Sequence, residues 1–289
     1  MPLLKIIILG IVQGLAELLP VSSSAHVVVT EKLLGLDPSS PSMTLLLVML
    51  HTGTRFAVIV YFWPQWRRSY FQSVAAFKAI ALRVIVATVI TAVVGEILVK
   101  IIESTIFRDV PHAQIEDLFS HLEFIAPALA AAGILILVAG ILERRRPAAD
   151  SLKADELNLK RAAVIGAVQG LCLPFRGFSR SGATISAGML LGMAKARAEA
   201  FSFALAVVLT PAVLAREAMR LMHESRAGGS AGLASIAGST VLGAVVAFFA
   251  GLLALRWLSR WLESGRWYLF GIYCLIAAVA VAALYHAGY

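Results

Sequence analysis

The sequence predicts an all-α polytopic membrane protein with about six transmembrane helices and two re-entrant helical hairpins. The first observation is composition, because 60% of the 289 residues are hydrophobic, only 15% are charged and the mean hydropathy is +0.85. A soluble domain carries about 25% charged residues. The second is that the apolar runs are long and lack the period-two alternation of β-barrel strands. The third is a pair of apolar segments interrupted by Pro, Gly and Ser clusters.

Six windows are long enough to cross about 30 Å of hydrocarbon as helices of roughly 20 residues. They lie at approximately 43–63, 80–102, 124–142, 199–221, 233–256 and 267–286. The N-terminus lacks the basic region, short apolar core and cleavage site of a signal peptide, so residues 1–35 are expected to belong to the mature fold. Residues 1–289 are therefore interpreted as one integral membrane domain.

The charges of the connecting segments predict the orientation in the membrane. Basic residues gather at 67–78, 144–161, 195–197 and 256–266, which are therefore expected to be cytoplasmic. The segment 103–123 is acidic on balance, as a translocated loop can be, and six spans then place both termini outside. The net charge of +8 includes no basic aromatic stripe, so nucleic acid is not expected as a partner.

The two interrupted segments, 6–35 and 162–192, are predicted to form re-entrant hairpins, because their breaks would leave backbone groups unpaired in lipid. They also resemble each other: "ILGIVQGLAELLPVSSSAH" at 8–26 aligns with "VIGAVQGLCLPFRGFSRSGAT" at 164–184. Three predicted spans separate them, so the second hairpin should enter from the opposite face. This predicts an inverted-topology repeat, approximately 1–145 and 158–289, whose hairpin tips meet inside the bilayer.

The hairpin tips carry polar groups that are costly inside a membrane, where one charge costs about 2.5–3.5 kcal/mol and therefore usually serves a function. The first tip contains Gln13, Glu17, Ser22, Ser23, Ser24 and His26, and the second contains Arg176, Ser179, Arg180, Ser181 and Thr184. Glycine-rich turns followed by a helix N-terminus at about 182–184 would direct N–H groups toward an anion. Arginine adds a planar fork that matches phosphate. The tips together predict a phosphate site.

The same segments resemble a known family. "GIVQGLAELLPVSSSAH" is similar to the (E/Q)-x-x-x-E plus P-V-S-S-x-x-H signature of the undecaprenyl-diphosphate phosphatases, the bacitracin-resistance family, and "GFSRSGATIS" resembles its P-G-x-S-R-S-x-x-T signature. The similarity extends through "LLVMLHTGTRFAVIVYFW" at 46–63 and "AFSFALAVVLTPAVLA" at 200–215. It implies an enzyme of the bacterial inner membrane, open to the periplasm, that removes the terminal phosphate of undecaprenyl diphosphate and recycles this lipid carrier for peptidoglycan synthesis.

The resemblance also implies residue roles. Gln13 and Glu17 match the pair associated with a divalent cation, Mg²⁺ or Ca²⁺, and here the pair brings only one negative charge. Arg180 matches the arginine that should clamp the diphosphate, His26 a general acid or base, and Ser23 the candidate nucleophile. Other expected phosphate contacts are Ser22, Ser24, Arg176, Ser179, Ser181 and Thr184. Arg176 stands where the family usually has proline.

Several alternatives stay open at this point. A water activated by Glu17 or His26 could attack in place of Ser23. A lipid-phosphate flippase or secondary transporter could use the same architecture, and a homodimer is left open. "HAQIEDLFSH" at 112–121 has the spacing of a metal site but is more readily interpreted as a solvated amphipathic helix. His51 and Thr52 are reserve candidates for supporting contacts, and Arg55 is expected to pair, line the cavity or snorkel.

Overall fold

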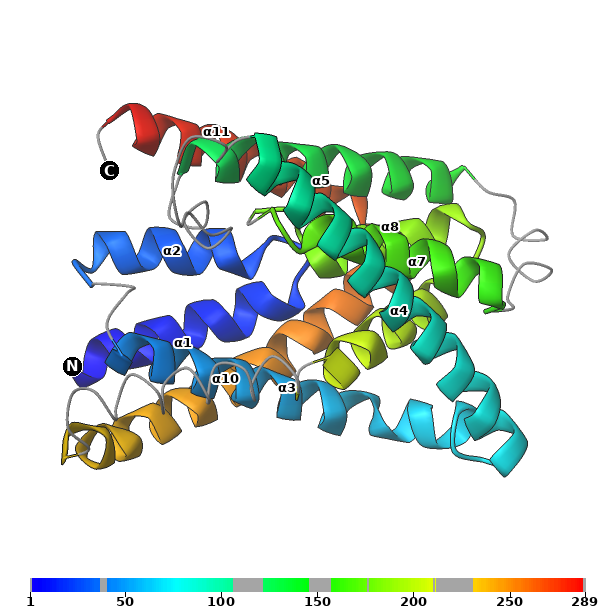
Figure 1. Cartoon of the computed structure of the whole chain (residues 1–289), viewed down its shortest axis with the longest axis horizontal. Coiled ribbons are helices and arrows are strands. Elements are labelled where there is room, and N and C mark those ends of the chain that lie inside the picture. Colours follow the sequence, from blue (N-terminus) through cyan, green and yellow to red (C-terminus); the bar gives the residue numbers. More distant parts are fainter. Residues whose placement is uncertain are drawn as a thin grey trace.

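The computed structural model describes residues 2–36, 41–105, 122–145, 157–175, 177–209, 211 and 231–287, and every regular element within these ranges is a helix. The helices are α1 (Leu3–Leu18), α2 (Ser23–Leu33), α3 (Pro41–Ser69), α4 (Val74–Thr105), α5 (Leu122–Arg144), α7 (Leu159–Cys172), α8 (Arg180–Leu190), α10 (Ala231–Glu263) and α11 (Tyr268–His286). Residues 195–209 form a further helix between α8 and α10. Figure 1 shows the arrangement. The all-α prediction is confirmed.

Five helices in the described ranges are long and apolar enough to cross a membrane. These segments are Leu45–Ser69, Val74–Thr105, Glu123–Arg144, Thr240–Glu263 and Tyr268–His286. They overlap five of the predicted windows, with ends that differ by up to about seven residues. The remaining window, 199–221, begins inside the helix at 195–209 and continues into residues outside the described ranges. The chain is therefore a polytopic membrane protein.

Proline and glycine create the breaks between the paired short helices. Leu19, which precedes Pro20, has the extended conformation φ −79°, ψ 151°, because the proline ring disfavours the helical region for the residue before it. The second break contains Pro174 and Gly177, and Gly177 has φ +101°. A Cβ at Gly177 would also lie 2.5 Å from the carbonyl oxygen of Ile125, so position 177 excludes any side chain.

Each short hairpin packs against a long helix from the other half of the chain. Helix α1 lies along α10, and α7 lies along α4. Gly14 allows the first contact, because a Cβ there would lie 2.5 Å from the Cβ of Ala250. Gly170 allows the second, where a Cβ would lie 2.8 Å from the Cβ of Val94. Small residues permit this close approach between membrane helices. Gly14 and Gly170 occupy matching positions in the two similar sequences.

The two hairpin turns meet near the middle of the molecule. In Figure 1 the α1–α2 hairpin comes from the left and the α7–α8 hairpin from the right. Contacts join the turns directly: the Gly177 N–H donates to Ser24 Oγ at 3.3 Å, and Ser181 Oγ donates to the carbonyl oxygen of Leu19 at 3.5 Å. The re-entrant position of the hairpins in a bilayer and the boundaries of the inverted repeat stay predictions.

Candidate active site

The carboxylate of Glu17 lies at the centre of a polar cluster between the hairpin turns. Its Oε1 accepts hydrogen bonds from Arg55 Nη2 at 2.6 Å and Arg180 Nη2 at 3.1 Å. Its Oε2 accepts from Ser23 Oγ at 2.5 Å, and His51 Nε2 lies 3.8 Å away. Glu17 is buried, with 7% of its surface exposed, so these partners are needed to stabilise its negative charge. The sequence-predicted residues Glu17, Ser23 and Arg180 are therefore in direct contact.

Gln13 lies one helical turn before Glu17 on the same face of α1, as its spacing predicts. Its Nε2 donates to Glu17 Oε2 at 3.4 Å, while its buried Oε1 has no hydrogen-bond partner among the described residues. These ranges contain no group of three or more His, Cys, Asp or Glu side chains that could hold a metal ion. A divalent cation bound here would take Gln13 Oε1 and Glu17 Oε2 as protein ligands, with phosphate and water oxygens as the others.

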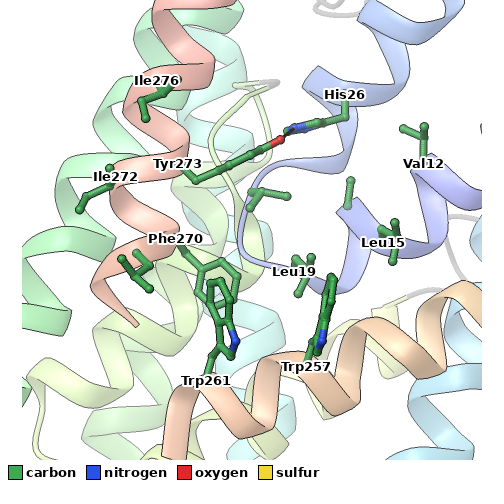
Figure 2. A pocket seen from close by; sticks show the side chains of 13 residues that line it. Val12, Leu15, Leu19, His26, Trp257, Trp261, Phe270, Ile272, Tyr273 and Ile276 are labelled. Atoms are coloured by element: carbon green, nitrogen blue, oxygen red, sulfur yellow. Dashed lines mark hydrogen bonds between the residues drawn. The ribbon is translucent and has the colours of Figure 1, made fainter. Parts of the chain in front are cut away.

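The turn after Pro20 determines which ring nitrogen of neutral His26 carries the proton. Ser22 has φ 66°, ψ 91°, outside the conformations common for residues other than glycine, and its carbonyl oxygen faces His26 Nδ1 at 2.8 Å. A carbonyl oxygen only accepts, so Nδ1 carries the proton and Nε2 of the neutral ring accepts. Figure 2 shows that Nε2 faces the phenol of Tyr273, with Nε2 and the hydroxyl oxygen 2.7 Å apart. The two rings are stacked, with centroids 5.7 Å apart.

The hydroxyl groups of the second turn make hydrogen bonds inside the protein. Helix α8 begins at Arg180, earlier than the predicted 182–184, because Ser179 caps it: Ser179 Oγ accepts from the Gly182 N–H at 3.2 Å. Thr184 Oγ1 donates to the carbonyl oxygen of Arg180 at 2.8 Å and is hydrogen-bonded to Ser202 Oγ at 2.6 Å.

In the first turn, Ser22 Oγ and Ser24 Oγ lie 3.3 Å apart. Arg176 lies outside the described residues, as does the segment 112–121.

Two residues in contact with the site carried no catalytic or binding prediction. The sequence predicts that Arg55 pairs, lines the cavity or snorkels, and in the structure it makes the shortest ion pair with Glu17 among the described residues. The signal for Arg55 was an arginine inside the apolar run 46–63, four residues after His51 and thus on the same helix face. Tyr273 had no comparable signal. Thr52 Oγ1 donates to the carbonyl oxygen of Val48 within α3.

An apolar pocket of about 550 Å³ lies beside His26, among α1, α2, α10 and α11 (Figure 2). Its wall is formed by Val12, Leu15, Ala16, Leu19, Val21, His26, Trp257, Trp261, Leu269, Phe270, Ile272, Tyr273 and Ile276. The polar pair of His26 and Tyr273 thus borders a space that is otherwise lined by hydrocarbon and indole groups. A ligand with one polar end and one apolar end suits this boundary.

Over almost its whole length the chain is similar to one protein family and to several named members of the undecaprenyl-diphosphatases. Residues 6–280 match the family model described as bacitracin resistance protein BacA. The chain is 55% identical over 287 residues to undecaprenyl-diphosphatase 2 of Acinetobacter baylyi, which covers 98% of both chains. It is 33% identical to the undecaprenyl-diphosphatases of Acidiphilium cryptum, over 93% of both chains, and Rhodopirellula baltica, over 98% of both. The chain therefore belongs to the bacitracin resistance protein BacA family.

Proposed function

We propose that this protein hydrolyses undecaprenyl diphosphate to undecaprenyl phosphate and inorganic phosphate in the bacterial inner membrane. One observation carries the proposal: Glu17 accepts a hydrogen bond from the hydroxyl of Ser23 and is also paired with the guanidinium of Arg180. A hydroxyl nucleophile and an anion-binding group thus both contact one carboxylate, which would act as the base. The activity named for the relatives from A. baylyi, A. cryptum and R. baltica supports the same conclusion.

In the proposed reaction Ser23 Oγ attacks the terminal phosphorus and its proton passes to Glu17 Oε2. The bond from that phosphorus to the bridging oxygen breaks, and undecaprenyl phosphate leaves. A water then attacks the phosphoserine, the bond from phosphorus to Ser23 Oγ breaks as inorganic phosphate leaves, and Ser23 Oγ takes back the proton held by Glu17. In the neutral ring Nδ1 donates to the Ser22 carbonyl oxygen, so His26 Nε2 carries no proton and would be a base for that water once it exchanges its hydrogen bond with Tyr273. Arg180 neutralises charge on the transferring phosphoryl group.

The apolar pocket supports a lipid substrate. An isoprenoid chain is apolar along its length, so it would gain from burial among the walls of this pocket, which include Trp257, Trp261 and Phe270. His26 and Tyr273 stand at its polar boundary, so a chain in the pocket would carry its diphosphate toward the hairpin turns (Figure 2). The pocket and the polar cluster would then bind the two ends of one molecule.

The proposal includes a divalent cation, Mg²⁺ or Ca²⁺, and further phosphate contacts. Gln13 Oε1 and Glu17 Oε2 would hold the cation, which would supply positive charge to the diphosphate. The phosphate contacts proposed from the sequence are Ser22, Ser24, Arg176, Ser179, Ser181 and Thr184. The hydroxyls of Ser181 and Thr184 have protein partners, so they would have to exchange these bonds for bonds to phosphate.

The proposed topology places the site mouth on the periplasmic face, with both termini on that side. Two features support this arrangement. Helix α1 begins and α11 ends on the same side of the molecule (Figure 1), and the acidic segment 103–123 contrasts with the basic segment 144–161. The crossed packing of α1 on α10 and of α7 on α4 also supports the inverted repeat.

The direct experiment is phosphate release from undecaprenyl diphosphate by the purified protein in detergent. Release by the wild type but not by Glu17→Gln would support the proposal, because that substitution removes the base and the negative charge. A wild-type protein that releases no phosphate, yet moves undecaprenyl phosphate across the bilayer of reconstituted liposomes, would replace the phosphatase by the flippase.

A further inference from the structure

Arg55 is held in the site by only one of its three guanidinium nitrogens. Its Nη2 donates to Glu17 Oε1 at 2.6 Å, whereas Nε and Nη1 are buried and have no hydrogen-bond partner among the described residues. The whole residue is 9% exposed. Buried donors on a charged group are rarely left unsatisfied, since this loses hydration without a replacement. Nε and Nη1 therefore require an acceptor that the described part of the chain does not provide.

The charge of the cluster points to an anionic acceptor. The guanidinium groups of Arg55 and Arg180 both pair with the single carboxylate of Glu17, which leaves one positive charge uncompensated. His51 is the other ionisable side chain within 4 Å of Glu17 among the described residues, and it adds no negative charge. Gln13, one turn away, brings an amide rather than a second carboxylate. An excess positive charge at a buried site favours an anion as the missing partner.

We propose that Arg55 is a second diphosphate-binding arginine, which together with Arg180 grips the two phosphoryl groups while Glu17 holds both guanidinium groups in place. The identity of the ligand rests on the proposed phosphatase function. The position of Arg55 agrees with this role, because an arginine within the apolar span Leu45–Ser69 is expensive unless it serves a cavity. Glu17 Oε1 touches both arginines, so their side chains approach the same point from α3 and α8.

Equilibrium binding of a non-hydrolysable probe tests the proposal without turnover. The probe is farnesyl methylenediphosphonate, in which a P–CH₂–P unit replaces the scissile anhydride, added to the purified full-length protein in detergent. Arg55→Gln should weaken binding by about 10- to 100-fold, the range expected for loss of a charge-assisted hydrogen bond. Arg55→Lys, which keeps the charge, should lose less. Lys100→Gln removes an exposed charge on α4 and is the matched control, expected to bind as the wild type does.

A second comparison separates a phosphate contact from an effect through Glu17. If Arg55 only positions that carboxylate, Arg55→Gln should cause no further loss of probe binding once Glu17→Gln is present. If Arg55 binds the diphosphate, the double variant should bind the probe about 10-fold or more weakly than Glu17→Gln alone. Melting temperatures and gel filtration establish that each variant is folded, and Arg55→Lys serves if Arg55→Gln is not.

The outcomes separate this inference from the phosphatase assignment. Unchanged probe affinity in folded Arg55→Gln would overturn the role of Arg55 in diphosphate binding. A buried water would then be the acceptor for its Nε and Nη1. A wild-type protein that does not bind the probe would overturn that role as well. Failure of the wild type to release phosphate from undecaprenyl diphosphate would instead overturn the proposed function, and the probe measurement would still report whether Arg55 holds a diphosphate.

Discussion

Ser23 Oγ donates a 2.5 Å hydrogen bond to Glu17 Oε2, although the two residues lie on separate helices on either side of the turn at Pro20. The proline break bends the chain back so that the first residue of α2 reaches the last turn of α1. Glu17 Oε1 faces the arginines, and Oε2 faces the serine and Gln13. One carboxylate can therefore orient the cations and take a proton from the hydroxyl.

Arg180→Lys keeps the positive charge but removes the planar fork of donors, so we expect turnover to fall about 10²–10³-fold, as for loss of one transition-state donor. The measurement is the rate of phosphate release at saturating substrate. Arg144→Lys is the matched control, because it makes the same exchange of arginine for lysine at the end of α5, where Arg144 stacks over Tyr268. Near-normal turnover in Arg180→Lys would move the role of the clamp to another cation.

Single cysteines introduced into the connecting segments should report the orientation. A cysteine at 112–121 should react with a membrane-impermeant maleimide in intact cells, and one at 147–157 should react only after lysis, because basic segments stay cytoplasmic. Replacing Cys172 and Cys274 first removes the native thiols, which are buried and unpaired. The opposite labelling pattern would place the acidic segment in the cytoplasm and would contradict the periplasmic mouth.

Gly53→Ala should destabilise the fold, because the new Cβ would lie 2.1 Å from the carbonyl oxygen of Ala244 and force α3 away from α10. Overpacking of this kind costs about 1–3 kcal/mol, so the melting temperature of the detergent-solubilised protein should fall. Gly238→Ala on α10 is the control, since a Cβ there meets nothing within 4 Å among the residues that the structure describes. Equal melting temperatures for the two variants would contradict the close α3–α10 contact.

The sequence was most informative where function depends on residues close together in the chain. Gln13 and Glu17 could be placed on one face from their spacing, and the breaks at Pro20 and Gly177 predicted both hairpins. The contacts of Glu17 with Arg55 and of His26 with Tyr273 join residues 38 and 247 positions apart. Such contacts depend on helix packing, which apolar periodicity does not specify, because nearly every face of these helices is apolar.

Removal of divalent cations should lower turnover without abolishing it, because two arginines already contribute positive charge at Glu17. The measurement is phosphate release in EDTA, followed by titration with Mg²⁺ or Ca²⁺. Gln13→Glu should reduce the cation concentration needed for half-maximal activity, since a second carboxylate strengthens binding of a hard cation. Turnover that is insensitive to EDTA in the wild type, and unchanged cation dependence in Gln13→Glu, would remove the metal from the proposal.

The final prediction distinguishes Ser23 from water as the nucleophile. If Ser23 attacks, Ser23→Ala should abolish turnover while leaving diphosphate binding nearly intact, and wild-type protein quenched during turnover should carry phosphate on Ser23. If water attacks, Ser23→Ala loses only a hydrogen bond to a charged acceptor, worth about 1.5–3 kcal/mol, and turnover should fall roughly 10- to 150-fold. The contact between Ser23 Oγ and Glu17 Oε2 favours the serine, because the proton to be removed already points at a carboxylate. Mass spectrometry of the quenched protein, together with the rate of Ser23→Ala, decides between the two. Residual turnover in that range without phosphoserine would exclude covalent catalysis and leave the phosphatase assignment standing, with Glu17 or His26 activating the water.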